Sequence, residues 1–154
     1  MELQDKYMAI ARKIDLFRGL DPADVGKIFA KGVTVRAAKG EALFYKGTVG
    51  NQMYVVLGGK VGILDGEKLL ATLHTGDMFG EMAIISNEPR SASAVALEDS
   101  ALFVLSESTF HHLMTKRVAI QILLNIISVL GHRLRDANTH LRQLGGGESA
   151  PTPR

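Results

Sequence analysis

Seven short apolar runs, separated by glycine-bearing turns, fill the middle of the chain and constrain its fold more than any other feature. In chain order the runs are Val33–Val35, Ala42–Tyr45, Met53–Leu57, Val61–Leu64, Leu69–Leu73, Ala92–Leu97 and Ala101–Leu105. Short strands at regular spacing with such turns are typical of an antiparallel β-sandwich or β-barrel. Because no long helical pattern separates the runs, a parallel α/β sheet is disfavoured. We therefore predict a mainly β region over about residues 33–105.

Helical patterns precede this β region. Apolar residues three or four positions apart predict one helical face, at Leu3, Tyr7, Ile10, Ile14 and Phe17. Asp21 followed by Pro22 is typical of a helix start, which predicts a second helix over residues 23–30. That helix would bury Val25, Ile28 and Phe29.

A long final helix is predicted over about residues 118–144, and its apolar residues follow a heptad pattern. They are Ile120, Leu123, Ile127, Leu130, Leu134, Ala137, Leu141 and Leu144. The first half of the helix is apolar on nearly every side, so more than one face must be covered. One face can pack on the β region, and the other is most simply covered by the same helix of a second copy. The alternative is a helix that folds entirely into its own domain.

The composition places limits on the class of protein. A chain of 154 residues is one ordinary domain, which we expect to span residues 1–144, followed by a flexible glycine- and proline-bearing tail over residues 145–154. Its first 20 residues lack the apolar core of a signal peptide, and the apolar stretch 118–130 is too short to cross a membrane. We therefore expect a cytoplasmic protein with no membrane partner. Met1 and the polar tail favour a complete small protein over an excised domain.

The chain carries no pattern that predicts an enzyme or a metal site. It has no cysteine, which excludes thiol nucleophiles, zinc–thiolate sites and disulfides. Its serines lack a nucleophile-elbow pattern, and His74 is the one histidine in the β region. A net charge of +2 and the lack of interleaved aromatic residues argue against nucleic acid as a partner. The sequence predicts neither catalysis nor a bound metal or cofactor.

The segment from Gly76 to Ala92 has the composition of a small anion site. A short helical turn is predicted to start near Glu81, and unpaired amides at a helix start attract anions. Arg90 can direct two hydrogen bonds onto anionic oxygens, while the Glu81 carboxylate accepts hydrogen bonds from hydroxyls. A ligand with a phosphate and a neighbouring hydroxyl would satisfy both side chains, which indicates a phosphorylated sugar or a nucleotide. The alternative is that Arg90 and Glu81 form an ordinary ion pair with each other.

From Asp15 to Leu144, the sequence resembles the cyclic nucleotide-binding domains of the bacterial catabolite activator protein, of cyclic nucleotide-regulated kinases and of ion channels. The likeness centres on the family's phosphate-binding cassette, matched here by residues 79–84 and 90–92. Upstream, residues 40–44, Gly47, residues 54–56 and residues 59–61 match in the same order. The resemblance implies an antiparallel jelly-roll β-barrel with N-terminal helices and a long C-terminal helix. This agrees with the fold predicted from the apolar runs.

The resemblance also implies a role for each site residue. Arg90 would bind the cyclic phosphate and Glu81 the ribose 2′-hydroxyl, with Phe79 inside the cassette. Backbone amides would complete the phosphate site around Gly80, Met82, Ala83 and Ser91. The walls against ribose and base would be Ile63, Leu70 and Ala71. The residue that caps the base would come from the final helix, where the candidates are Arg133, Arg135, Ala137 and Asn138.

Two functions follow as hypotheses. The first is a regulatory module that binds cAMP, or else cGMP, and signals through its final helix to an unidentified protein. Ser91 carries a hydroxyl as the threonine of some cGMP-binding members does, so cAMP is favoured mainly because it is the commoner ligand in the bacterial branch. The second is a dimerisation or protein-interaction module on the same fold that works without nucleotide.

Overall fold

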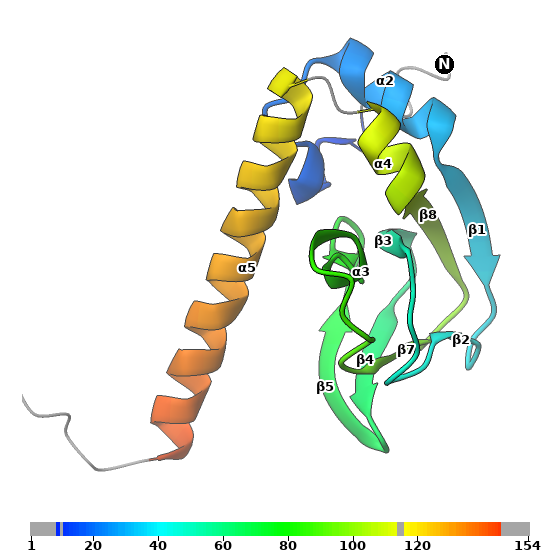
Figure 1. The fold of residues 1–154 in the computed structure, drawn as a ribbon. Coiled ribbons are helices and arrows are strands. Elements are labelled where there is room, and N and C mark those ends of the chain that lie inside the picture. Colours follow the sequence, from blue (N-terminus) through cyan, green and yellow to red (C-terminus); the bar gives the residue numbers. More distant parts are fainter. Residues whose placement is uncertain (1–8, 10, 114–115, 146–154) are drawn as a thin grey trace, which may run out of the picture.

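Two four-stranded antiparallel sheets form the centre of the computed structural model, which describes residues 9, 11–113 and 116–145 (Figure 1). One sheet has the order β1-β8-β3-β6, from strands Val33–Ala37, Ser100–Ser106, Gln52–Gly58 and Met78–Phe79. The other has the order β2-β7-β4-β5, from strands Ala42–Phe44, Ser93–Ala96, Val61–Asp65 and Lys68–Leu73. Except for the β4–β5 hairpin, strands adjacent in space are not consecutive in sequence, as in a jelly roll.

The seven strands predicted from the apolar runs are all present, with ends that differ by one or two residues. The turn at Asp65-Gly66 joins β4 and β5, with Gly66 in the left-handed region. The short strand β6 was not predicted, because Met78 and Phe79 are too few to form a recognisable apolar run. They pair with Val55 and Tyr54 of β3, so their strand conformation comes from a partner distant in sequence.

Apolar side chains form two core clusters. The first lies between the two sheets and includes Val56, Val61 and Leu102, each with no exposed surface. The second packs the other side of the β1–β8–β3 sheet against the helices, through Phe17, Phe29 and Phe103. These three rings contact one another, with centroids 4.9–6.5 Å apart. Edge-on and tilted ring pairs of this kind add to the stability that burial supplies.

The helices lie at one end of the barrel and along its side (Figure 1). Helix α2, Pro22–Lys31, follows Asp21 and buries the three predicted residues. The 3-10 turn η1, Asp15–Phe17, replaces the last part of the predicted first helix, whose residues Leu3, Tyr7 and Ile10 lie outside the described residues. Helix α4, Glu107–Leu113, was not predicted, and the short helix α3, Met82–Ile85, lies in the cassette. The predicted tail after Gly145 also lies outside the described residues.

Helix α5, Lys116–Leu144, stands beside the barrel as the heptad pattern predicted (Figure 1). Val118, Ile122 and Ile126 are buried in the second core cluster. By length and composition alone, α5 is long and apolar enough from Arg117 to Leu144 to span a membrane. Residues 118–130, which we predict from the sequence to be too short for a span, are only part of this helix. A single helix of this kind is weak evidence for a span, since a helix packed on a protein core passes the same test.

Candidate functional site

The cassette reverses the chain sharply between β6 and α3. Gly80 has a φ of 77°, a conformation that a side chain would strain. This turn directs the Gly80 carbonyl toward Arg90, whose Nη1 donates a 2.9 Å hydrogen bond to it. The helical turn predicted near Glu81 is present as α3, because the amides of Ile84 and Ile85 donate to the Glu81 carbonyl.

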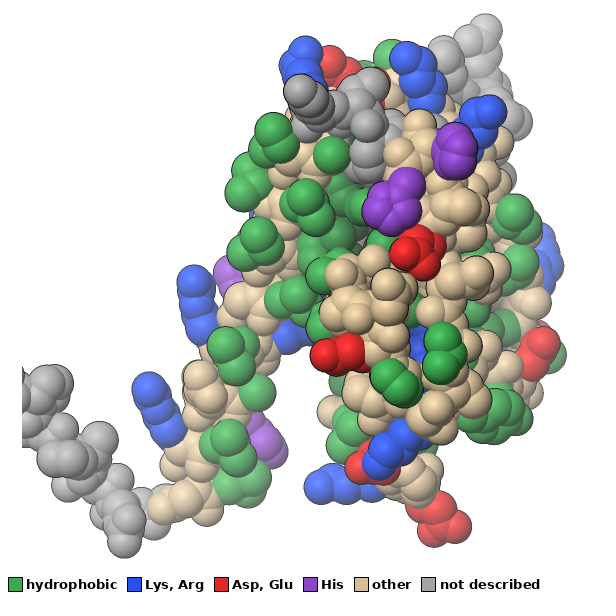
Figure 2. Space-filling view, viewed as in Figure 1, with side chains coloured by type: hydrophobic (Ala, Val, Ile, Leu, Met, Phe, Trp, Pro, Cys, Tyr) green, Lys and Arg blue, Asp and Glu red, His purple; other side chains and the backbone are tan. Residues whose placement is uncertain are grey.

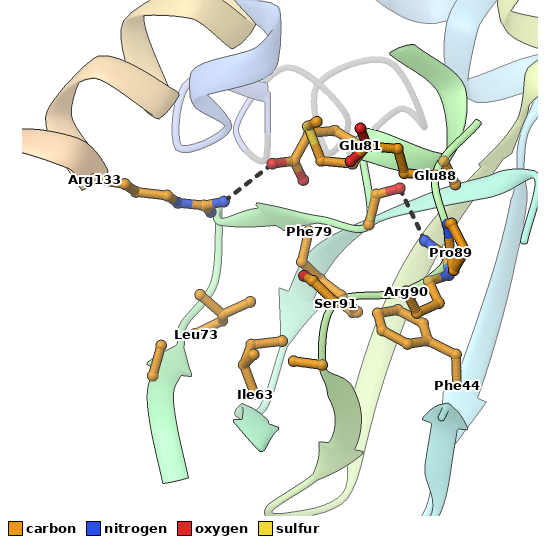
Figure 3. A pocket seen from close by; sticks show the side chains of 15 residues that line it. Phe44, Ile63, Leu73, Phe79, Glu81, Glu88, Pro89, Arg90, Ser91 and Arg133 are labelled. Carbon is orange, nitrogen blue, oxygen red and sulfur yellow. Dashed lines mark hydrogen bonds and ion pairs between the residues drawn. The ribbon is translucent and has the colours of Figure 1, made fainter. Parts of the chain in front are cut away.

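A cavity of about 260 Å³ opens between the cassette, the β4–β5 hairpin and α5 (Figure 3). Its lining combines three chemical surfaces. The first is the guanidinium of Arg90 at the cassette end. The second is the pair of Glu81 and Arg133 at the α5 side. The third is an apolar wall formed by residues from the strands, namely Ile63, Ala71, Leu73 and Phe79.

Arg90 is a nearly buried cation, with 7% of its surface exposed. Besides its bond to Gly80, it donates from Nη2 to the Gln52 carbonyl at 2.8 Å. The Phe44 ring centroid lies 4.1 Å from Cζ, a cation–π distance. Burial lowers the pKa of Arg90, and the nearby Tyr54 and Glu81 act in the opposite direction. Among buried side-chain atoms of the described residues, only Nε of Arg90 lacks a hydrogen-bond partner.

Glu81 is also buried, with 6% of its surface exposed, and its partner is Arg133 rather than Arg90. Arg133 Nη1 lies 3.5 Å from the Glu81 carboxylate, and Arg133 Nη2 donates to the Met78 carbonyl. The simple Arg90–Glu81 ion pair considered from the sequence is therefore not what forms. Figure 3 shows the Arg133 side chain reaching from α5 to the cassette.

Most of the predicted site residues line this one cavity. They are Ile63, Ala71, Phe79, Gly80, Glu81, Met82, Ala83, Arg90, Ser91 and Arg133. Four predicted residues do not line it, namely Leu70 and the α5 candidates Arg135, Ala137 and Asn138. Leu70 has no partner in the β4–β5 pairing because the register shifts between Ile63 and Leu64, and its side chain is half exposed. Asn138 lies on the exposed end of α5, more than one helical turn beyond Arg133.

Several lining residues were missed by sequence reasoning. Leu73 replaces Leu70 on the apolar wall, since it shares a strand face with Ala71 two positions away. Alternation along β5 could have indicated Leu73, but the bulge at Leu70 could not be read from the sequence. Phe44 faces Arg90 from β2, nearly fifty residues earlier, and only the fold brings the two together.

The three surfaces suit a particular class of small molecule. The Nε–H of Arg90 is a buried donor without an acceptor, which is costly unless an acceptor binds there. The Glu81 carboxylate can accept hydrogen bonds from hydroxyls, and the apolar wall can cover a flat or aliphatic group. An anionic group, an adjacent hydroxyl and an apolar body on one ligand would therefore meet complementary surfaces.

Comparison with known sequences agrees with this chemistry. The family profile described as "Cyclic nucleotide-binding domain" matches residues 34–117. The chain is 35% identical over 139 residues to the cyclic AMP receptor protein of Thermus thermophilus, covering 87% of this chain and 63% of that protein. It is 34% identical over 104 residues to a cGMP-dependent protein kinase of Eimeria tenella, covering 67% of this chain and 10% of the kinase. The chain thus spans less than two-thirds of either relative.

Comparison with solved structures supports the fold. The catabolite activator protein of Thermus thermophilus superimposes with a TM-score of 0.73 at 34% identity, covering 85% of this chain and 63% of that one. Mainly antiparallel sheets, flanking helices and a long C-terminal helix are common to both, as the resemblance implied. Because the family profile spans more than half of its length, the chain belongs to the cyclic nucleotide-binding domain family.

Proposed function

We propose that the cavity binds a cyclic nucleotide, with cAMP preferred to cGMP, and that residues 1–144 act as a regulatory module for another protein. The observation that carries this proposal is a buried guanidinium with an unpaired N–H, placed in the same cavity as a buried carboxylate. The two side chains do not form an ion pair with each other, since the partner of Glu81 is Arg133. A ligand with both an anion and a hydroxyl accounts for both groups.

The cyclic phosphate would lie against Arg90. Its anionic oxygens would accept from Nε, the donor that has no partner among the described residues. While Nε binds the phosphate, the hydrogen bonds from Nη1 and Nη2 to the Gly80 and Gln52 carbonyls would hold the guanidinium in place. A charge-assisted hydrogen bond in a nearly buried position is stronger than one between neutral groups. Amides near Ser91 and at the start of α3 would add further donors.

The ribose 2′-hydroxyl would donate to Glu81, where Arg133 already lies. Arg133 belongs to α5, so the ligand and the helix share one carboxylate. Binding would change the surroundings of Arg133 and hence the position that α5 prefers. This supports signalling through α5, whose outer face is available to another chain.

The base would cover the apolar wall of Ile63, Ala71 and Leu73. Arg133 would be the α5 residue that contacts the base, which its place in the cavity lining supports, and Asn138 stays a prediction that requires movement of the helix end. Preference for cAMP rests on the likeness to a receptor whose name specifies cyclic AMP. Ser91 is at the cavity and carries a hydroxyl, so selection against guanine must come from other groups.

The test is isothermal titration of the purified protein with cAMP, cGMP and 5′-AMP. The protein is first unfolded and refolded, which removes any nucleotide retained from expression. We expect tight binding of cAMP, weaker binding of cGMP and none of 5′-AMP.

Two variants test the site residues. Arg90→Lys keeps the positive charge but loses the planar set of N–H donors, and Glu81→Gln keeps the side-chain shape but loses the negative charge. Each should raise the Kd at least about tenfold, as expected for one charged hydrogen bond.

The matched controls make the same two substitutions, arginine to lysine and glutamate to glutamine, at positions away from the cavity. Arg36→Lys and Glu67→Gln alter exposed residues outside the cavity, and both should leave the Kd unchanged. Equal affinity in the wild type and the two cavity variants would refute the site assignment. No heat with any cyclic nucleotide, from a sample shown to be refolded, would instead favour the nucleotide-independent interaction module.

A further inference from the structure

We propose that Gly50 is a positioning residue for Arg90, because only a residue without a side chain lets the guanidinium lie where it does. This inference rests on the proposed function and adds a residue to it. Gly50 lies in the connection between β2 and β3, forty residues before the arginine that it accommodates. It is not among the residues that line the cavity.

The evidence is steric. A Cβ built on Gly50 would lie 2.7 Å from both Cζ and Nε of Arg90 and closer still to Nη2. All three atoms belong to the guanidinium, so the added Cβ would collide with the planar group itself, on the side of Nε and Nη2. Heavy atoms do not approach to such distances, so the guanidinium would have to leave its position. The guanidinium would then lose its hydrogen bonds to the carbonyls of Gly80 and Gln52.

The backbone does not itself require glycine at this position. Gly50 is not among the glycines with positive φ, so alanine fits its backbone conformation. The atoms in conflict are the far end of one flexible side chain, which can move without disturbing the fold. The effect of a side chain at Gly50 should therefore fall on Arg90 and on ligand binding, and on stability only through the two hydrogen bonds that the guanidinium loses.

The first test is the affinity of Gly50→Ala for cAMP, measured by titration beside its melting temperature. We expect the Kd to rise about tenfold to a hundredfold, the equivalent of a charged hydrogen bond. The melting temperature should fall by several degrees, because the Gly80 and Gln52 carbonyls lose their donor, and the protein should stay folded at the titration temperature. The matched control is Gly58→Ala, which also lacks positive φ and whose Cβ would meet nothing within 4 Å. Its Kd should equal that of the wild type.

The second test needs no nucleotide. The buried Nε–H of Arg90 should give a resolved arginine side-chain signal in a ¹H–¹⁵N spectrum, assigned by its loss in Arg90→Lys. We expect Gly50→Ala to shift or broaden this signal and Gly58→Ala to leave it in place. An unchanged Arg90 signal in Gly50→Ala would refute the positioning role.

The two proposals fail in different ways. If the wild type binds no cyclic nucleotide, the proposed function is wrong, while the spectrum still decides whether Gly50 positions Arg90. If the wild type binds cAMP and Gly50→Ala binds it equally well, the proposed function stands and the inference about Gly50 is wrong.

Discussion

At the scale of single residues, three aromatic rings form a cluster beside Arg90, the cation that the cavity buries. Tyr54 stacks on Phe79 with ring centroids 5.0 Å apart, and Phe44 contacts both rings and the guanidinium of Arg90. Burial raises the pKa of Tyr54, and the positive charge of Arg90 acts against that rise. The tyrosine hydroxyl is thus held protonated in the folded protein to a higher pH than in the unfolded chain.

This shift predicts a loss of stability in alkaline solution. Above the ordinary pKa of 10.0, the unfolded chain releases the Tyr54 proton while the folded protein retains it, so unfolding is favoured as pH rises. Tyr54→Phe removes the effect. Urea unfolding between about pH 9 and pH 11 should show the free energy of the wild type falling more steeply than that of Tyr54→Phe.

Tyr45→Phe is the control for that measurement, since it removes the same hydroxyl from a ring that is 65% exposed. Its pH dependence should follow the wild type. Parallel curves for the wild type and Tyr54→Phe would show that Tyr54 titrates alike in both states, contrary to the prediction.

At the scale of elements, α5 is held to the domain by polar contacts at three points along its length, the first being Arg117, whose Nη2 lies 3.8 Å from the Asp21 carboxylate. Next, Asn125 Nδ2 donates to the carbonyls of Leu16 and Arg18, both at 2.8 Å. Further along, Arg133 binds the cassette. Beyond Arg133 the described residues of the helix are exposed. The helix therefore has an anchored part and a projecting part, and Arg133 marks the boundary at the cavity.

The anchor at Asn125 should be important for stability. Asn125→Ala leaves two carbonyls without their donor in a mostly buried place, which should cost about 2–4 kcal/mol in the free energy of unfolding. Urea denaturation measures this change. Ser128→Ala, an exposed position one turn away, should change it by no more than about 0.5 kcal/mol. Equal stability of the two variants would mean that Asn125 does not anchor the helix.

At the scale of the whole molecule, the outer side of α5 is an apolar surface that its own domain leaves uncovered. Ile120, Leu123, Ile127, Leu134 and Leu141 of the heptad pattern are all exposed (Figure 2). Leu130 of the same pattern packs against the core instead. Contiguous apolar surface of this kind is typical of an interface. The regular heptad spacing favours a second copy of the same helix as the partner.

A homodimer through α5 is therefore expected in solution. Leu134→Glu places a charge in the centre of the exposed seam, and should convert the dimer to a monomer in sedimentation experiments. Thr139→Glu places the same charge on the opposite, polar side of the helix and should leave the dimer intact. A wild-type protein that sediments as a monomer at all concentrations would exclude this assembly.

The sequence by itself determined seven of the eight strands, helices α2 and α5, and which cassette residues line the cavity. The apolar runs predicted seven strands, and the heptad pattern predicted α5, because alternation and helical periodicity are local properties of the chain. The motif around Glu81 and Arg90 identified the cavity, since its residues are close in sequence as well as in space. Predictions that depended on local spacing were the ones that held.

Only the tertiary structure decided which distant residues meet. A register shift excludes Leu70 and leaves Leu73 on the wall, the Glu81 carboxylate pairs with Arg133, and Gly50 makes room for Arg90. Each of these outcomes depends on strand pairing or helix packing between segments far apart in the chain. Local residue preferences do not contain that information, because the contacts form only when the sheets and α5 pack together.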